Sequence, residues 1–186
     1  MSAVGLDHLQ ALYANGDDPW GFRTSAYEQA KFQATAAALS HSRYESALEL
    51  GCGNGELARH IAPRCDHYTG VDVVDRALDA ARRAVPRGRF VRAFLPCDLP
   101  DGPYKLIILS EVLYFLDRPA LASLGRQIVR RWPGAEVIAV TWLGPSGNPL
   151  EGEAALAVFS AATEPTLTAA LVARTPQYRI DRFTAS

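Results

Sequence analysis

The stretch Leu48-Glu49-Leu50-Gly51-Cys52-Gly53-Asn54-Gly55 decides the fold, because an apolar run ends there at three closely spaced glycines. The next apolar residues have the spacing i, i+1, i+4 and i+5, which is one face of a helix; they are Leu57, Ala58, Ile61 and Ala62. A strand, a glycine turn and a helix in this order let the backbone approach a ligand and point the first helical amides at it. The stretch therefore predicts a ligand-binding loop.

An acidic residue follows at the distance that a ribose-containing ligand requires. Asp72 ends the next β-like run, twenty-one residues after Gly51, and its carboxylate can accept hydrogen bonds from both ribose hydroxyls. The loop departs from the dinucleotide fingerprint G-x-G-x-x-G, since Glu56 stands in the place of the third glycine. That carboxylate disfavours a pyrophosphate. It does not disfavour S-adenosylmethionine (SAM), which has no phosphate and whose positive charges suit Glu49. The residues favour SAM over NAD, and both remain open.

The rest of the chain alternates β-like runs with helical patterns, which predicts a Rossmann-like α/β fold, a doubly wound and mostly parallel sheet with helices on both faces. Strands are expected at 47–50, 68–72, 90–94, 106–109, 137–142, 167–174 and 178–183. The last two are joined by a short turn at Pro176 and are expected to pair antiparallel. Residues 1–40 contain two helical segments, around Leu6–Ala14 and Tyr27–Leu39. Because ligands bind at the carboxyl ends of the strands, we expect this extension to cover that edge as a helical lid.

Length and composition set limits on the class of protein. The 186 residues fit a single domain, 1–186, in which 1–40 form the lid and 41–186 the SAM-binding core. A net charge of −1, from 19 basic and 20 acidic residues, argues against a nucleic-acid surface. Three cysteines without CxxC spacing predict neither a disulfide framework nor a zinc site. The apolar runs are too short for a membrane span, and the first residues do not resemble a signal peptide, so we expect a cytoplasmic protein.

Three further segments carry a resemblance to a known family: DPWGFRTSAYEQAK at 18–31, PYKLIILSEVLYFL at 103–116 and YRID at 178–181. Together with LELGCGNG, they resemble the class I SAM-dependent methyltransferases and, more narrowly, the NodS-like subfamily of nodulation N-methyltransferases. The resemblance implies a seven-stranded sheet whose last strand is antiparallel. Members of this subfamily N-methylate the free amine of deacetylated chitin-like oligosaccharides. The implied acceptor is therefore a small molecule with a free amine, an amino sugar or chitooligosaccharide.

The resemblance also implies that the glycine loop and Glu49 line the methionine part of SAM and that Asp72 holds the ribose. Arg23 is expected to bind the SAM carboxylate as a bidentate donor. Many class I enzymes place an Asp after the third strand against adenine; here Phe94 stands near that place. We expect either that Asp98 curls back or that Phe94 and backbone amides hold the ring. The residues expected to bind SAM, or its product S-adenosylhomocysteine (SAH), are Arg23, Glu49, Gly51, Cys52, Gly53, Gly55, Asp72, Val73, Phe94, Leu95 and Ser110.

Methyl transfer from a sulfonium is an in-line displacement, so the enzyme mainly has to align donor and acceptor. Aromatic faces tolerate the positive charge; Trp20 and Tyr27 are expected to bind the acceptor. Glu111 is expected to hold the acceptor ammonium and pass on its proton, with Tyr114 as the second catalytic residue. Paired metal ligands are not apparent, so no metal is expected. A SAM-dependent O-methyltransferase, an NAD-dependent oxidoreductase and a non-catalytic SAM-binding protein remain as alternatives.

Overall fold

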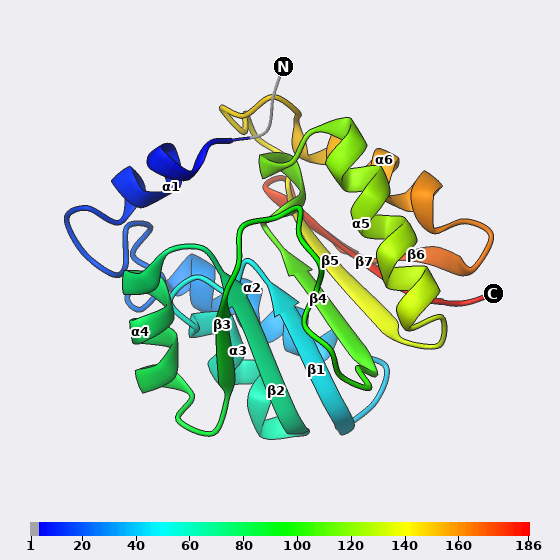
Figure 1. Cartoon of the computed structure of the whole chain (residues 1–186), viewed down its shortest axis with the longest axis horizontal. Helices are drawn as coiled ribbons and strands as arrows, with labels where there is room; N and C mark the ends of the chain where they lie inside the picture. Colours follow the sequence, from blue (N-terminus) through cyan, green and yellow to red (C-terminus); the bar gives the residue numbers. More distant parts are fainter. Residues whose placement is uncertain (1–3) are drawn as a thin grey trace.

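Seven strands form one sheet in the order β3-β2-β1-β4-β5-β7-β6 (Figure 1). The computed structural model describes residues 4–186, so the first three residues of the expected lid lie outside the described residues. The strands are β1 (Tyr44–Leu50), β2 (Cys65–Asp72), β3 (Arg89–Arg92), β4 (Leu106–Ser110), β5 (Glu136–Trp142), β6 (Leu167–Arg174) and β7 (Tyr178–Ala185). β1 to β5 are parallel, and β7 runs antiparallel to both β5 and β6. The predicted Rossmann-like sheet with an antiparallel last strand is confirmed.

Helices cover both faces of the sheet because the central strands are apolar on both sides. The helices are α1 (Leu6–Leu12), α2 (Ala26–Ala37), α3 (Glu56–Ile61), α4 (Asp75–Ala84), α5 (Arg118–Arg131) and α6 (Gly152–Thr163), with short 3₁₀ turns η1 (Ala62–Arg64) and η2 (Leu113–Phe115). In β4, Ile107 and Leu109 join the cluster under α5 and α6, whereas Leu106 and Ile108 join the cluster under α2 and α3. This two-residue period buries alternate side chains on opposite faces.

One predicted strand is shorter than expected at its carboxyl end. β3 was predicted over 90–94, but it ends at Arg92. Its neighbour β2 ends at Asp72, and the last ladder bond runs from the backbone N–H of Ala93 to the carbonyl of Asp72 (2.9 Å). Phe94 therefore has no strand beside it and leaves the sheet with a side chain that is 41% exposed.

Of the two N-terminal helices, α1 lies near the carboxyl ends of the parallel strands, and α2 packs on one face of the sheet (Figure 1). Leu6, Leu9 and Leu12 of α1 pack on a small buried cluster that includes Tyr13 and Val73. Arg76 donates hydrogen bonds to the carbonyls that follow α1 and so ties this segment to α4. Among residues 4–186, none of the helices has the length and apolar character needed to span a membrane.

Candidate active site

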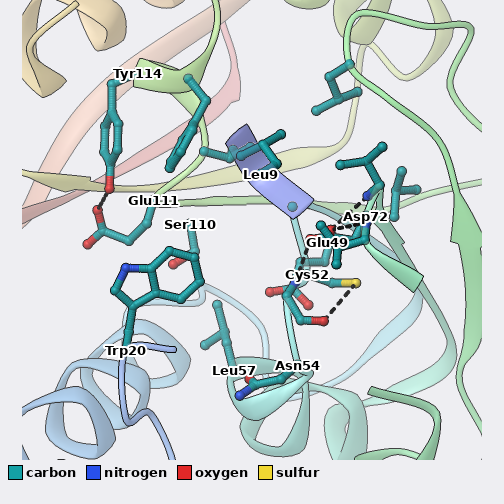
Figure 2. A pocket seen from close by; sticks show the side chains of 18 of the residues that line it. Leu9, Trp20, Glu49, Cys52, Asn54, Leu57, Asp72, Ser110, Glu111 and Tyr114 are labelled. Atoms are coloured by element: carbon teal, nitrogen blue, oxygen red, sulfur yellow. Dashed lines mark hydrogen bonds between the residues drawn. The ribbon is translucent and has the colours of Figure 1, made fainter. Parts of the chain in front are cut away.

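A cavity of about 430 Å³ opens at the carboxyl ends of the parallel strands, a size typical of small-molecule sites. Every residue predicted for the site lines it except Arg23, Tyr27 and Gly55. The predicted residues that do line it are Trp20, Glu49, Gly51, Cys52, Gly53, Asp72, Val73, Phe94, Leu95, Ser110, Glu111 and Tyr114. Figure 2 shows two sides of the cavity, with Glu111 and Tyr114 on one and Glu49, Cys52 and Asp72 on the other. We call these the acceptor side and the cofactor side.

The glycine loop has the backbone that only glycine adopts without strain. Gly51, Gly53 and Gly55 have φ angles of 73°, 51° and 81°. A Cβ on Gly51 would lie 2.7 Å from Val112 Cγ2, and one on Gly55 would lie 2.8 Å from Ala81 Cα. Gly55 does not line the cavity; it precedes α3 and lets that helix approach α4 closely.

Asp72 is fixed beside the loop by three backbone donors. Its Oδ2 accepts the N–H of Gly53 (2.9 Å), and its Oδ1 accepts those of Val73 (2.7 Å) and Val74 (3.0 Å). Burial raises the pKa of Asp72, and these three bonds oppose that rise. A carboxylate has about four acceptor positions, so the arrangement leaves one open for a ligand hydroxyl. A ribose diol would take this position and share or displace one backbone N–H.

Glu49 supplies a second carboxyl group on the cofactor side. It is 2% exposed, and its Oε2 accepts a hydrogen bond from the Tyr68 hydroxyl (2.6 Å). Burial raises the pKa of Glu49 to about 8, although the bond from Tyr68 lowers it. A cation placed beside this group would favour its ionised form. The cofactor side therefore fits the ammonium and sulfonium of SAM better than it fits a phosphate.

The apolar end of the cofactor side lies at the loop after β3. Ala93, Phe94 and Leu95 line it together with Val73 and Val74. Asp98 is exposed and is not among the lining residues, so it does not curl back toward the cavity. Of the two arrangements expected for adenine, the geometry leaves the one that uses Phe94 and the backbone.

The acceptor side is organised around Glu111. Its Oε2 accepts hydrogen bonds from the Tyr114 hydroxyl (2.7 Å) and the Trp142 backbone N–H (3.1 Å), and its Oε1 accepts one from Lys31 Nζ (3.0 Å). Burial and the neighbouring Glu111 raise the pKa of Tyr114 well above its ordinary value, so this phenol remains a donor. Glu111 has a φ of 55°, the only positive φ of a non-glycine residue between residues 4 and 186. The surroundings hold it there.

Aromatic side chains form the outer wall. Trp20 is 45% exposed and stacks on Phe22 with ring centroids 5.4 Å apart, while Tyr13 meets it edge-on at 5.6 Å. Tyr27, predicted to contact the acceptor, does not line the cavity. It packs against Tyr178, and the ammonium of Lys31 lies 5.5 Å from its ring centroid.

Arg23, predicted to bind the SAM carboxylate, does not line the cavity either. Its guanidinium pairs with Asp17 (2.7 Å) and Glu56 (3.4 Å). Glu56, which is 4% exposed at the start of α3, also pairs with Arg59. In this structure, the carboxylates of Asp17 and Glu56 therefore pair with the guanidinium that was predicted to bind SAM.

Several residues of the site were missed from the sequence. Lys31, Glu28 and Trp142 line the acceptor side, and no local pattern marks them. Asp18 could have been predicted from the sequence, because Asp before Pro and Gly is a common turn residue whose side chain accepts backbone N–H groups. Its carboxylate accepts the N–H groups of Phe22 and Arg23 and the side-chain amide of Asn54 (3.0 Å), which links the N-terminal segment to the glycine loop.

The part of the chain that the structure describes contains no group of three or more His, Cys, Asp or Glu residues able to hold a metal ion. Independently of this, the structure combines a mostly parallel sheet, in which the antiparallel β7 lies between β5 and β6, with a glycine loop after β1 and a carboxylate at the end of β2. These features define the class of protein, the class I SAM-dependent methyltransferases.

Comparison with known families agrees with this class and indicates a particular family within it. The family model described as nodulation protein S (NodS) matches residues 6–131. The chain belongs to the nodulation protein S family. It is 32% identical over 162 residues to nodulation protein S of Sinorhizobium fredii, covering 83% of this chain and 68% of that one. It is 35% identical over 108 residues to that of Bradyrhizobium diazoefficiens, covering 54% and 50%. The chain thus spans about half to two thirds of the length of these relatives.

Solved structures share the fold. The N-methyltransferase NodS from Bradyrhizobium japonicum in complex with SAH has a TM-score of 0.79 and 21% identity, covering 96% of this chain and 97% of that one. A putative methyltransferase from Pseudomonas syringae has a TM-score of 0.73 and 30% identity, covering 86% and 99%.

Proposed function

We propose that this protein is a SAM-dependent N-methyltransferase whose acceptor is the free amine of an amino sugar, such as a deacetylated chitooligosaccharide. The observation that carries the proposal is the presence of both halves of the reaction in one cavity: a cofactor side at Glu49 and Asp72, and an acidic acceptor side at Glu111. Membership of the nodulation protein S family, and a neighbour described as an N-methyltransferase in complex with SAH, support it.

SAM, when bound, supplies an activated methyl group on a sulfonium. On the cofactor side, Asp72 would bind the ribose and Glu49 would face the ammonium, while Phe94 and Leu95 would cover the adenine. The glycine loop would let the methionine part approach the backbone, because no Cβ stands in the way. Donor alignment is the main contribution that this chain can make, since a sulfonium leaving group needs no protonation.

On the acceptor side, Glu111 would bind the amine as it arrives in its ammonium form. An α-amino group has a pKa near 8, so a neutral fraction exists at pH 7 and no strong base is required. Tyr114 orients Glu111 as a permanent donor, and Trp20 would shield the site from water with its indole face. The loop that contributes Pro145 and Ser146 would set the shape of the acceptor pocket.

The first test is calorimetric titration with SAH. We expect wild type to bind and Asp72→Ala to bind at least about tenfold more weakly, because hydrogen bonds to a charged group are worth about 1.5–3 kcal/mol. Asp79→Ala, an exposed carboxylate on α4, is the matched control and should bind like wild type. If wild type does not bind SAH, the glycine loop is a structural turn and the proposal fails.

The second test is transfer of labelled methyl from SAM to glucosamine and deacetylated chitin oligomers, with N-acetylated forms as controls. Methylation confined to the deacetylated sugars is the expected result. SAH binding with methylation of hydroxyl acceptors only would identify an O-methyltransferase. SAH binding without methylation of either set of acceptors would identify a non-catalytic SAM-binding protein. Binding of NADH, without binding of SAH, would identify an oxidoreductase.

We also propose that the protein is cytoplasmic. The three cysteines, Cys52, Cys65 and Cys97, are all unpaired, which is typical of a reducing compartment.

A further inference from the structure

Three charged side chains meet on the acceptor side, and we call Glu28, Lys31 and Glu111 the charged triad. Glu28 and Lys31 lie one turn apart on α2, and Glu111 follows β4, eighty residues further along the chain. Lys31 Nζ lies 2.9 Å from Glu28 Oε2 and 3.0 Å from Glu111 Oε1. All three line the cavity. Only tertiary packing brings them together.

Lys31 is an unusually buried cation. Its side chain is 4% exposed, and lysine is almost never fully buried unless it is paired. Burial lowers the pKa of Lys31, but the two carboxylates raise it by more, so Lys31 remains an ammonium. Buried ion groups can often be replaced by apolar residues without loss of stability. Their occurrence in the wall of a cavity therefore points to a role in binding.

The charged triad carries one negative charge in excess when both carboxylates are ionised. Glu28 Oε2 is shielded from solvent and accepts no hydrogen bond from any residue that the structure describes; its approach to Lys31 is an ion pair without hydrogen-bond geometry. The Glu28 side chain as a whole is 15% exposed and lines the cavity, so this carboxyl group, held beside Lys31, can face a ligand.

Glu111 is held with its carboxylate fixed toward Lys31 and Tyr114. Its backbone N–H continues the ladder to the Val140 carbonyl (2.9 Å), although its φ is 55°. Such a conformation is strained and persists only where the surrounding structure holds it in place. Here three donors anchor the side chain. Strain of this kind is concentrated at functional sites.

The reaction moves a positive charge toward this side of the cavity. A neutral amine nitrogen forms a bond to the methyl carbon, the carbon–sulfur bond breaks with its electron pair left on sulfur, and the product is an N-methylammonium and SAH. The proton that the arriving ammonium loses goes to solvent or to a carboxylate before attack. The positive charge therefore passes from sulfur to nitrogen. A fixed negative charge beside the nitrogen stabilises the transition state more than the ground state.

We propose that the charged triad is the recognition site for a primary ammonium, with Lys31 as the positioning residue that fixes Glu111 and limits the excess negative charge to one. This inference rests on the proposed function. Glu28 and Glu111 contact the acceptor nitrogen, whereas Lys31 acts through Glu111. The triad selects acceptors by charge, so a free amine is accepted and an N-acetylated amine or a plain hydroxyl is not.

The test measures binding separately from turnover. Glucosamine and N-acetylglucosamine are titrated into SAH-saturated protein, and the change in intrinsic tryptophan fluorescence is followed, since Trp20 and Trp142 line the cavity. Wild type is expected to bind glucosamine at least about tenfold more tightly than the N-acetylated sugar, the size of a charge-assisted hydrogen bond. Glu28→Gln makes the triad neutral and is expected to abolish this preference. Glu45→Gln, on the exposed side of β1, is the control and should retain it.

The double variant Glu28→Gln/Lys31→Met separates charge from position. Glu111 is then the only charged residue of the triad, so the net charge is again −1 and the preference for glucosamine should return. Its kcat should remain at least several-fold below that of wild type, because Glu111 has lost one of its three anchors. A purely structural role would instead leave the double variant as unselective as Glu28→Gln. SAH affinity should be unchanged in both variants.

Three outcomes would overturn the proposal: equal binding of both sugars by wild type, a preference that survives Glu28→Gln, or a double variant without restored preference. Each is distinct from failure of the proposed function. Selective binding of glucosamine without methyl transfer would support the role of the charged triad in recognition and refute the proposed N-methyltransferase activity. Methyl transfer to glucosamine with no charge preference in binding would refute the role of the charged triad and support the proposed activity.

Discussion

Replacing Gly55 with alanine tests the geometry on which the cofactor side depends. The residue has a φ of 81°, and a Cβ there would lie 2.8 Å from Ala81 Cα and 3.0 Å from Ala81 Cβ. An L-residue in the left-handed region costs about 1–2 kcal/mol. Overpacking costs about 1–3 kcal/mol more, and the nearest atom is backbone that cannot rotate away. We therefore expect Gly55→Ala to lower the free energy of unfolding by roughly 2–5 kcal/mol.

Two other glycines supply matched controls. Gly147 also has a positive φ, 69°, but a Cβ there meets nothing within 4 Å. Gly147→Ala should therefore show only the conformational cost, about 1 kcal/mol. Gly134 has neither a left-handed φ nor a neighbour within 4 Å, so Gly134→Ala should be neutral or slightly stabilising. Comparing the three variants separates the cost of the steric clash with α4 from the cost of placing an L-residue in the left-handed backbone conformation.

The assay is thermal unfolding followed by circular dichroism, with urea unfolding as a check. For a chain of this length, 1 kcal/mol corresponds to about 2–4 °C, so Gly55→Ala should melt about 10 °C lower and Gly147→Ala about 3 °C lower. If Gly55→Ala is no less stable than Gly147→Ala, then α3 does not approach α4 as closely as the structure places it, and the account of the glycine loop is refuted.

Three further predictions concern charged groups around the cavity. The pKa of Glu49, about 8 against 4.5 unperturbed, means that the folded state retains a proton that the unfolded state has lost. Stability should therefore fall as pH rises from 4.5 to 8, by about 1.4 kcal/mol per pH unit from this group, and urea unfolding of Glu49→Gln should lack that slope. Arg23→Ala should change SAH affinity by less than about threefold in calorimetry, because exposed ion pairs contribute little; a tenfold loss would mean that Arg23 turns into the cavity. Asp18→Ala should lower stability by about 1–3 kcal/mol and weaken SAH binding several-fold, because it leaves the buried Asn54 amide without a partner. Unchanged affinity in that variant would limit Asp18 to a structural role.

The sequence alone determined the order of strands and helices and the identity of the glycine loop. Those features follow from local rules, the two-residue period of a strand, the 3.6-residue period of a helix and the turn chemistry of glycine. Asp72 was predictable for the same reason, because the end of β2 lies at a fixed distance from the loop in this kind of fold. Two of the backbone N–H groups that hold its carboxylate, those of Val73 and Val74, are local as well, whereas that of Gly53 comes from the glycine loop.

Tertiary structure alone decided the acceptor side and the fate of two predicted contacts. Lys31 and Glu111 are eighty residues apart, and no period or motif records that α2 lies against the end of β4. Arg23 has nearby carboxylates that compete for it, and Phe94 leaves the sheet because β2 and β3 end together, at Asp72 and Arg92. Such contacts depend on how whole elements pack and on which partner lies nearest, and these are properties of the folded chain that local sequence patterns do not encode.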